Sequence, residues 1–317
     1  MLKETTENAI TFYLDLFISR FVVCSLCFPN GHGSKFLMKN YTVQADGIFR
    51  PRVPVEHRDD EYDQGGFETL CKMQEQHFWY RGRHRFIIGA LDRQLQRELP
   101  EMSAIDLGGG VGGWMRDLAR DRPQMFGRLA LADSSVLALT RAKTVLPTHV
   151  ERFQIDLMRL EMREEWDVAF MLDVIEHLPD DLDAILQAKE SLKPGGRLLI
   201  TAPAFPVFWS YNDDLAHHLR RYRRSDFSRL AKSAGLKLLD ARYFMFFLSP
   251  LYFLSRIKPG FARLSPAEQS AVIKKQHEVP RDIANAALAV IFNFETPLGH
   301  WAKFPWGTSI LGVFAKQ

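Results

Sequence analysis

The sequence predicts an α/β fold, in which helices cover both faces of a largely parallel β-sheet. From about Met102 onward, short apolar runs alternate with amphipathic helical segments. The apolar runs lack the polar alternation of a half-exposed strand, which indicates strands that are buried on both faces. Five glycines lie within residues 108–113, directly after the first apolar run. Repeated strand–helix units of this kind imply right-handed crossovers and a doubly wound sheet.

Five apolar runs are predicted as strands, namely residues 103–107, 128–133, 150–156, 166–172 and 197–202. In a doubly wound sheet, ligands bind beyond the carboxyl ends of the strands, where the strand order reverses. The residues that directly follow these runs are therefore the candidates for ligand binding.

Composition excludes several classes of protein and partner. The chain has 317 residues, with 46% hydrophobic and 25% charged residues, as in ordinary globular proteins. Its net charge of +3 is too small to argue for a nucleic-acid partner. Three cysteines cannot build a disulfide scaffold, so we expect a cytoplasmic protein. We expect it to be a monomer or a homodimer.

The N-terminal part is predicted to lie outside the core. Residues 9–28 are apolar, but Asp15 and Arg20 in their middle disfavour a membrane span, and no signal-peptide pattern is present. We expect a helix that packs on the body or on a partner subunit, with contact to a membrane surface as the alternative. Cys24 and Cys27 lack a second ligand pair, which favours core packing over a zinc site. Residues 29–65 are rich in glycine, proline and charge, so residues 1–65 are interpreted as an N-terminal helix and linker.

The glycine-rich segment 106–113, Asp-Leu-Gly-Gly-Gly-Val-Gly-Gly, fits two cofactor patterns. Gly108, Gly110 and Gly113 match the dinucleotide pattern G-x-G-x-x-G. Asp106, Gly108, Gly110 and Gly112 match D-x-G-x-G-x-G, the S-adenosylmethionine pattern. A purely structural tight turn is a third interpretation, because glycine also permits sharp turns without any ligand.

Further motifs follow the glycine segment in order. Asp133 ends the second predicted strand, where a carboxylate can accept both ribose hydroxyls, and Asp156 ends the third. Residues 172–179 read Leu-Asp-Val-Ile-Glu-His-Leu-Pro, and residues 192–203 contain Lys-Pro-Gly-Gly before the fifth strand. Together these motifs resemble the class I S-adenosylmethionine-dependent methyltransferases, especially bacterial small-molecule enzymes such as the ubiquinone-type O-methyltransferases. The resemblance covers about residues 77–245 and the last strand.

The resemblance implies a Rossmann-like seven-stranded sheet in the order 3-2-1-4-5-7-6. Residues 236–243 suit strand six and residues 308–315 suit strand seven. The long connection between them is rich in aromatic residues and is expected to be mostly helical, forming a roof over the carboxyl edge of the sheet. The expected parts are thus a cofactor-binding core at 66–245, a helical, aromatic-rich substrate lid at 246–305 and a final core strand at 306–317.

The resemblance also implies that S-adenosyl-L-methionine is the cofactor. In the segment 77–87, Arg83 is the best match to an arginine that meets the cofactor carboxylate, and Arg81 is the second choice; a solvated basic helix is the alternative. Asp106 is expected to hold the methionine amino group, Asp133 the ribose, Asp156 and Leu157 the adenine, and Leu172 and Asp173 the methionine side. The full expected cofactor-binding set is Trp79, Arg83, Asp106, Gly108, Gly110, Gly112, Asp133, Ser134, Asp156, Leu157, Leu172 and Asp173.

Catalysis is less well defined by the sequence. A sulfonium donor needs alignment and exclusion of water, and a base only where the acceptor loses a proton. The candidate bases are His177, Asp213, His218 and Tyr222. Local packing at a helix start is the alternative role of His177. Glu176 could join His177 as a metal ligand, but no third ligand is evident in the sequence, so no metal is expected.

The basic segment 217–224 has two interpretations. It could neutralise a carboxylate or phosphate of an acceptor, or it could be a basic loop that ties the insertion to the sheet, which is favoured. The predicted function is in-line methyl transfer to a small, largely apolar acceptor, optionally with an anionic head, such as a fatty acid, an isoprenoid or an aromatic natural product. No nucleic-acid partner and no membrane contact are expected. The alternatives are an NAD(P)-dependent oxidoreductase and a cofactor-binding relative without transfer activity.

Overall fold

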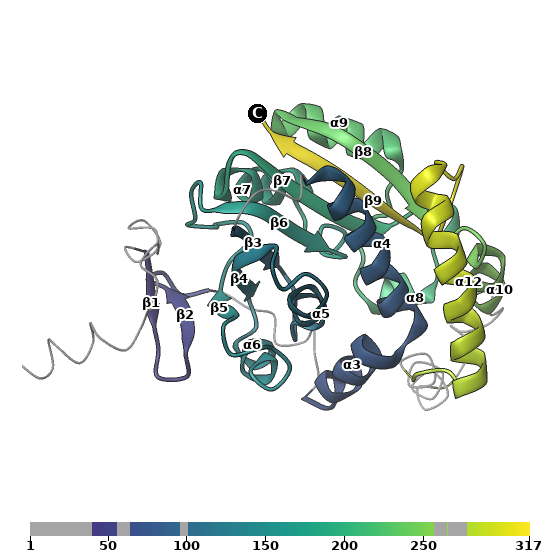
Figure 1. The fold of residues 1–317 in the computed structure, drawn as a ribbon, viewed down its shortest axis with the longest axis horizontal. Helices are drawn as coiled ribbons and strands as arrows, with labels where there is room; N and C mark the ends of the chain where they lie inside the picture. The colour runs from purple at the N-terminus through teal and green to yellow at the C-terminus, as the bar shows by residue number, and fades with distance from the viewer. Residues whose placement is uncertain (1–39, 56–63, 96–100, 257–264, 266–277) are drawn as a thin grey trace, which may run out of the picture. The chain divides into compact units, whose positions relative to one another are not determined.

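A mixed β-sheet with the strand order β1-β2-β5-β4-β3-β6-β7-β9-β8 organises the chain (Figure 1). The computed structural model describes residues 40–55, 64–95, 101–256, 265 and 278–317, which belong to one unit, Lys39–Gln317. The strands are β1 (Tyr41–Val43), β2 (Ile48–Pro51), β3 (Met102–Leu107), β4 (Phe126–Asp133), β5 (Glu151–Gln154), β6 (Trp166–Leu172), β7 (Leu192–Pro203), β8 (Leu236–Phe244) and β9 (Ser309–Lys316).

The predicted seven-stranded order is confirmed by the segment from β5 to β8 of this sheet. Strands β5, β4, β3, β6 and β7 pair in parallel, and β9 pairs antiparallel to both β7 and β8. Each predicted strand coincides with an observed one to within a few residues, except that β7 begins at Leu192 and so includes the predicted Pro-Gly-Gly turn. The carboxyl ends of the five parallel strands therefore share one edge of the sheet.

Two further strands lie in the segment that the sequence predicts to be a linker. Strands β1 and β2 form a hairpin, and β2 pairs in parallel with β5. Ile48 is fully buried, and the ring of Phe49 stacks on Phe153 of β5 with centroids 4.6 Å apart. Each strand has only three or four residues, too few to show an alternation in the sequence, which explains why the glycine and proline content favoured a linker.

Helices cover both faces of the sheet. They are α3 (Gln64–Gln76), α4 (Phe78–Gln94), α5 (Gly113–Asp121), α6 (Val136–Ala142), α7 (Asp181–Ser191), α8 (Tyr211–Leu215), α9 (Arg224–Ala234), α10 (Ser249–Arg256) and α12 (Asp282–Trp301), with a 3₁₀ turn at Pro206–Phe208.

Consecutive residues of β9 show how the helices are divided between the two faces. Val313 packs in the same cluster as Phe86 of α4 and Phe292 of α12. The next residue, Phe314, contacts Phe227 of α9, with ring centroids 5.6 Å apart. Because successive side chains of a strand point to opposite faces, α4 and α12 cover one face and α9 covers the other.

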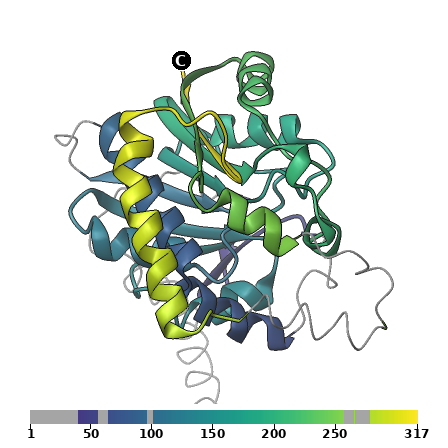
Figure 2. The ribbon, with the colours of Figure 1, turned by 90° about the vertical axis from the view of Figure 1, so that its right-hand side faces the viewer.

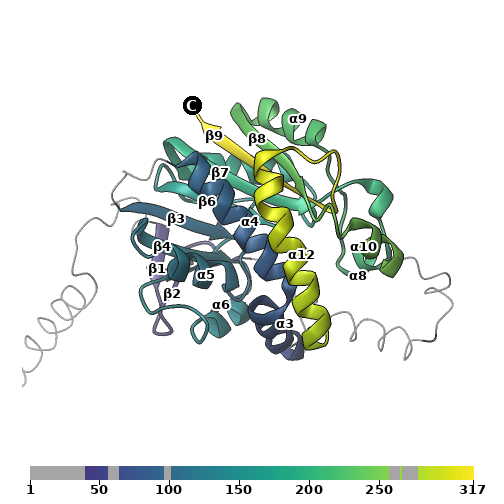
Figure 3. The same ribbon diagram turned by 45° about the vertical axis from the view of Figure 1, so that its right-hand side comes forward.

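The described part of the long connection between β8 and β9 contains the helices α10 and α12. Helix α12 lies along α4, as Figures 2 and 3 show, and its Glu295 accepts a hydrogen bond from the Phe247 amide just after β8. A Cβ atom on Gly82 would lie 2.0 Å from the ring of Phe292, so the two helices approach closely. Phe292 and Gly299 of α12 are buried, whereas the larger apolar side chains on its other side are exposed, namely Ile283, Val290, Ile291, Phe294 and Trp301. The shorter helix α10 lies beside the segment after β7. The ring centroids of Phe253 on α10 and Phe208 in that segment are 6.0 Å apart.

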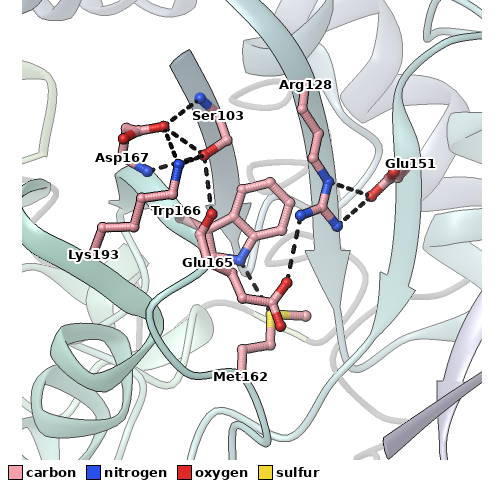
Figure 4. Close-up of polar contacts among 8 residues, drawn as sticks. All are labelled: Ser103, Arg128, Glu151, Met162, Glu165, Trp166, Asp167 and Lys193. Atoms are coloured by element: carbon pink, nitrogen blue, oxygen red, sulfur yellow. Dashed lines mark hydrogen bonds and ion pairs between the residues drawn. The ribbon is translucent and has the colours of Figure 1, made fainter. Parts of the chain in front are cut away.

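Charged groups tie the strands together near their amino ends (Figure 4). Asp167 of β6 accepts hydrogen bonds from Ser103 Oγ of β3 (2.7 Å) and Lys193 Nζ of β7 (2.7 Å). Arg128 of β4 lies 3.4 Å from Glu165 and stacks over the Trp166 ring, 4.1 Å from its centroid. These contacts lie at the edge of the sheet opposite the carboxyl ends, so the ligand-binding edge is left for other groups.

The predicted N-terminal helix at residues 9–28, with Cys24 and Cys27, lies outside the described residues. Among the residues that are described, no helix is both long and apolar enough to cross a membrane.

We expect Gly82→Ala to lower the free energy of unfolding by about 1–3 kcal/mol, because the new methyl group overlaps the Phe292 ring. An ordinary glycine-to-alanine change inside a helix is stabilising. Denaturant unfolding of Gly82→Ala, Phe292→Leu and the double variant measures the coupling. The penalty of Gly82→Ala should shrink in the Phe292→Leu background, and an equal penalty in both backgrounds would contradict this packing.

Candidate functional site

The loop between β3 and α5 forms a sharp bend at the carboxyl edge of the sheet. Gly108, Gly110 and Gly112 have φ angles of +80°, +59° and +83°, which side chains other than glycine rarely adopt. The amides of Gly108 and Gly109 both donate to the Ala132 carbonyl of the neighbouring strand, at 2.8 and 3.2 Å. A Cβ on Gly110 would have no described atom within 4 Å beyond its chain neighbours. The bend therefore exposes backbone to an open space.

Asp106 precedes this bend and is almost fully buried. Its Oδ1 atom has no hydrogen-bond partner within the described part of the chain. Burial raises the pKa of Asp106 to about 7, against the lowering effect of the Arg83 guanidinium, and the Asp133 carboxylate adds to the increase. A buried, unsatisfied carboxylate oxygen of this kind is suited to a cationic donor from a ligand.

Asp133 lies at the end of β4, next to the glycine bend. Its Oδ2 atom accepts a hydrogen bond from the Gly110 amide at 2.8 Å, and its Oδ1 atom accepts one from the Ser135 amide at 2.9 Å. Its side chain is half-exposed, so the carboxylate both shapes the loop and faces the edge of the sheet. Ser134, Asp156 and Leu157 are also half-exposed and follow the neighbouring strands β4 and β5.

Arg83 of α4 reaches the same edge, whereas Arg81 is exposed. The buried Arg83 side chain forms an ion pair with Asp173, which follows Leu172 at the end of β6. Its guanidinium also lies over the Trp79 ring, 4.8 Å from the ring centroid. Asp173 has a φ of +59°, and its amide donates to the Thr201 carbonyl of β7 at 3.0 Å. Of the two arginines considered from the sequence, Arg83 is the one that meets the other predicted residues.

Gln74 was not identified from the sequence as part of this site. The buried side chain of Gln74 on α3 accepts a hydrogen bond from the Gly113 amide at 3.1 Å, at the first turn of α5. A glutamine in a helix far upstream of the loop carries no sequence signal for this contact. The glycine bend is thus supported from α3 as well as from β4.

Two residues that follow β6 and one residue that follows α8 form a cluster of possible metal ligands. Glu176, His177 and His218 have potential ligand atoms that all lie within 4.8 Å of one another. Burial lowers the pKa of His177 to about 4, and the neighbouring His218 adds to this effect. From the sequence no metal was expected, because no third ligand was evident beside Glu176 and His177. In the structure, His218 lies where a third ligand would be needed.

Asp213 and Tyr222, two of the predicted bases, are held by structural contacts. The two carboxylate oxygens of Asp213 accept hydrogen bonds from Nε and one terminal nitrogen of Arg221, at 2.8 and 2.9 Å. One of these oxygens also lies 2.9 Å from His218 Nδ1. Burial alone would raise the pKa of Asp213, but hydrogen bonds from His218 and Arg221 outweigh it and hold the pKa well below its usual range. The Tyr222 hydroxyl lies 2.8 Å from Asp181, and burial and that carboxylate raise its pKa far above its ordinary value. Both residues are therefore poor proton acceptors at neutral pH.

The basic segment 217–224 is largely used in structural contacts, as the favoured interpretation of the sequence predicted. Arg221 donates to the Ala204 carbonyl at 3.1 Å in addition to its bond with Asp213. Arg220 pairs with Asp181, and Arg224 donates to the Phe304 carbonyl. These contacts tie the segment to β7, to α7 and to the chain before β9.

Comparison with known proteins identifies the family of this domain. The sequence profile described as a methyltransferase domain matches residues 78–241, just over half of the chain. The chain is 28% identical over 104 residues to phosphoethanolamine N-methyltransferase 2 from Caenorhabditis elegans, a match that covers 32% of this chain. It is 26% identical over 140 residues, or 42% of its length, to the ubiquinone biosynthesis O-methyltransferase of Paramagnetospirillum magneticum. The matched parts span only 24% and 53% of those two relatives.

Solved structures share the fold. A chain from the complex of the Haloferax volcanii Trm112 methyltransferase activator with a methyltransferase has a TM-score of 0.52 and 17% identity, and the match covers 81% of this chain and 96% of that one. Geranyl diphosphate C-methyltransferase from Streptomyces coelicolor has a TM-score of 0.50 and 13% identity, with 83% and 86% covered.

The family match decides between the two cofactors that fit the glycine run. S-adenosyl-L-methionine is the methyl donor of this family, and the NAD(P) alternative has no support from the match. The chain therefore belongs to the class I S-adenosylmethionine-dependent methyltransferase-domain family.

Proposed function

We propose that this protein transfers a methyl group from S-adenosyl-L-methionine to a small, largely apolar acceptor. The observation that carries this proposal is the open bend at Gly110 beside a buried Asp106 with an unpartnered oxygen. A purely structural turn would have no need for a buried, unsatisfied carboxylate next to an open backbone face.

The residues of the bend fit the parts of this cofactor. We infer that Asp106 accepts a hydrogen bond from the methionine ammonium group and that Asp133 accepts from the ribose hydroxyls. Gly108 and Gly110 allow close approach of the backbone. Arg83 faces the methionine carboxylate, sharing its charge with Asp173. Trp79, Gly112, Ser134, Asp156, Leu157 and Leu172 complete the proposed binding set. When bound, the cofactor supplies a methyl group on a sulfonium, so the protein mainly has to align the acceptor and exclude water.

The surface near the carboxyl end of β7 supports an apolar acceptor. Apolar side chains are exposed on the segment after β7 and on α10, namely those of Val207, Trp209, Leu251, Phe253 and Leu254. Exposed apolar side chains that gather in this way are typical of a binding surface. The Arg223 guanidinium lies 5.8 Å from the Phe205 ring and is suited to an anionic head on the acceptor. The two sequence relatives are named for N- and O-methyl transfer, so either atom is open for this chain.

We infer that His218 accepts the proton where the acceptor requires it, because burial lowers the pKa of His177 to about 4 and makes that ring a poor base. His218 is oriented by Asp213 through its Nδ1 atom, and His177 lies beside it with ring centroids 4.7 Å apart. A histidine whose one nitrogen is held by a carboxylate keeps the other for the reacting group.

Activity itself is tested with labelled S-adenosylmethionine and a panel of apolar acids, phosphates, phenols and amines. Transfer of label to at least one acceptor is expected. Binding of the demethylated cofactor without any transfer would favour the alternative of a cofactor-binding relative.

We expect the affinity for S-adenosylhomocysteine to fall at acidic pH because of Asp106. Its pKa in the ligand-free protein is about 7, and the ligand ammonium favours the ionised carboxylate. Below pH 7 the proton must be released on binding, so the dissociation constant should rise by up to about tenfold per pH unit, and above pH 7 it should level off. Calorimetry from pH 5.5 to 8.5 measures this. Asp106→Asn should bind weakly with a flat profile, and an unchanged slope in that variant would contradict the assignment.

Gly110→Arg should abolish cofactor binding, because the new side chain fills the open space at the bend. Gly195→Arg is the matched control. Gly195 also has a positive φ, +77°, and open space around its Cβ position, but it lies in β7 at the start of the strand, away from the bend. Calorimetry should show ligand binding by the control alone. Binding by Gly110→Arg with wild-type affinity would place the ligand elsewhere.

A further inference from the structure

We propose that Glu176, His177 and His218 bind one divalent transition-metal ion after the carboxyl end of β6. Their potential ligand atoms lie within 4.8 Å of one another. Two ligands that each lie about 2.1 Å from an ion are at most about 4 Å apart, so small side-chain rotations bring all three to one ion. Two imidazoles and one carboxylate are a ligand set that suits zinc and other first-row metals.

The buried carboxylate of Glu176 points to a cation. The residue is fully buried, and neither of its oxygens has a hydrogen-bond partner in the described ranges. Leaving a buried carboxylate without a partner is costly, and each such group in a native protein needs an explanation. Coordination of a metal ion would satisfy both the charge and the oxygen lone pairs.

The two histidines are oriented as metal ligands usually are. His218 Nδ1 lies 2.9 Å from the Asp213 carboxylate, which leaves Nε2 for a ligand role. The His177 ring is hydrogen-bonded to the backbone of Ala216. Metal-binding histidines commonly donate their second nitrogen to a carboxylate or a backbone carbonyl, which sets the tautomer and the ring orientation. Arg221 in turn donates a hydrogen bond to each carboxylate oxygen of Asp213.

Backbone contacts hold the two parts of the cluster together, although they are about forty residues apart in the chain. The Leu219 amide donates to the Glu176 carbonyl at 2.8 Å, and the His218 amide donates to the Asp213 carbonyl at 2.8 Å. The Tyr222 hydroxyl lies 3.1 Å from the Ile175 carbonyl. The cluster is thus held in place by hydrogen bonds of the surrounding fold.

Three protein ligands leave at least one coordination position for water or for an acceptor oxygen, as in catalytic sites. An acceptor hydroxyl bound to the ion would lose its proton to solvent water more readily, so with metal bound the two histidines would serve as ligands and not as the base. This role rests on the proposed function, whereas metal binding does not.

Metal binding is tested on the full chain after removal of bound metal with a chelator. Titration with Zn²⁺ by calorimetry and with Co²⁺ by absorption spectroscopy is carried out on the wild type, His177→Asn and His218→Asn. The matched control is His217→Asn, because His217 is exposed and adjacent to His218, and asparagine tolerates its φ of +52°. Wild type and control should bind one equivalent with nitrogen and oxygen ligation. Each ligand variant should lose at least about 100-fold in affinity.

Glu176→Gln keeps the test decisive if a histidine variant fails to fold. It removes the buried charge with little change in volume, so the metal-free variant should be at least as stable as the metal-free wild type, yet should not be stabilised by Zn²⁺ in a thermal melt. A wild type that binds no metal, or that binds it as tightly as His218→Asn, would overturn the proposal. A Co²⁺ spectrum with thiolate absorption that persists in the histidine variants would overturn it too.

Discussion

The backbone hydrogen bonds that bend the chain from β3 into α5 are the constraint on which the site depends. The Gly108 and Gly109 amides share the Ala132 carbonyl, and the Gly110 amide bonds to Asp133. These hydrogen bonds fix the backbone of the loop against the end of β4. In this conformation Gly108, Gly110 and Gly112 have positive φ, which glycine adopts without strain. Because α5 begins at Gly113, the same bend sets where that helix starts and leaves Asp106 buried beneath it.

A second constraint joins the helical layer to the sheet. The Arg83–Asp173 ion pair connects α4 to the end of β6, and Asp173 is further held by β7 through Thr201. Replacement of one partner would leave the other as a buried or half-buried charge, which is more costly than the pair is stabilising. Two sides of the candidate site, the glycine bend and the end of β6, are therefore positioned by different elements that meet at one edge. The contacts around Asp167 hold the opposite edge of the sheet independently (Figure 4).

The parallel core was predictable because its strands are long apolar runs and its loop motifs stand in a fixed order. The resemblance to the methyltransferase family favoured Arg83 over Arg81, and Arg83 is the buried one of the two. The hairpin of β1 and β2 was not predictable, since a few residues beside glycine and proline carry no periodic signal. The position of α12 was not predictable either. Apolar residues occur around most of α12 and would suit several partners, and the close approach of Phe292 to Gly82 shows that one of these partners is α4.

The histidine cluster shows a different limit of the sequence. Glu176 and His177 are adjacent in the chain, but His218 joins them only through the hydrogen bonds between the loops after β6 and β7. Contacts between distant loops are set by tertiary packing, so the sequence pattern does not show that His218 lies beside Glu176 and His177. The same packing explains why Asp213 orients a histidine and does not accept a proton itself.

The central claim is that the bend after β3 is the cofactor pocket of this methyltransferase domain. Hydrogen–deuterium exchange with and without S-adenosylhomocysteine tests it most directly, because exchange reports on each backbone segment. With ligand bound, exchange should slow at residues 106–113 and 133–135 and should not change at residues 165–167 of the opposite edge. Protection confined to other segments, or none at saturating ligand, would contradict it.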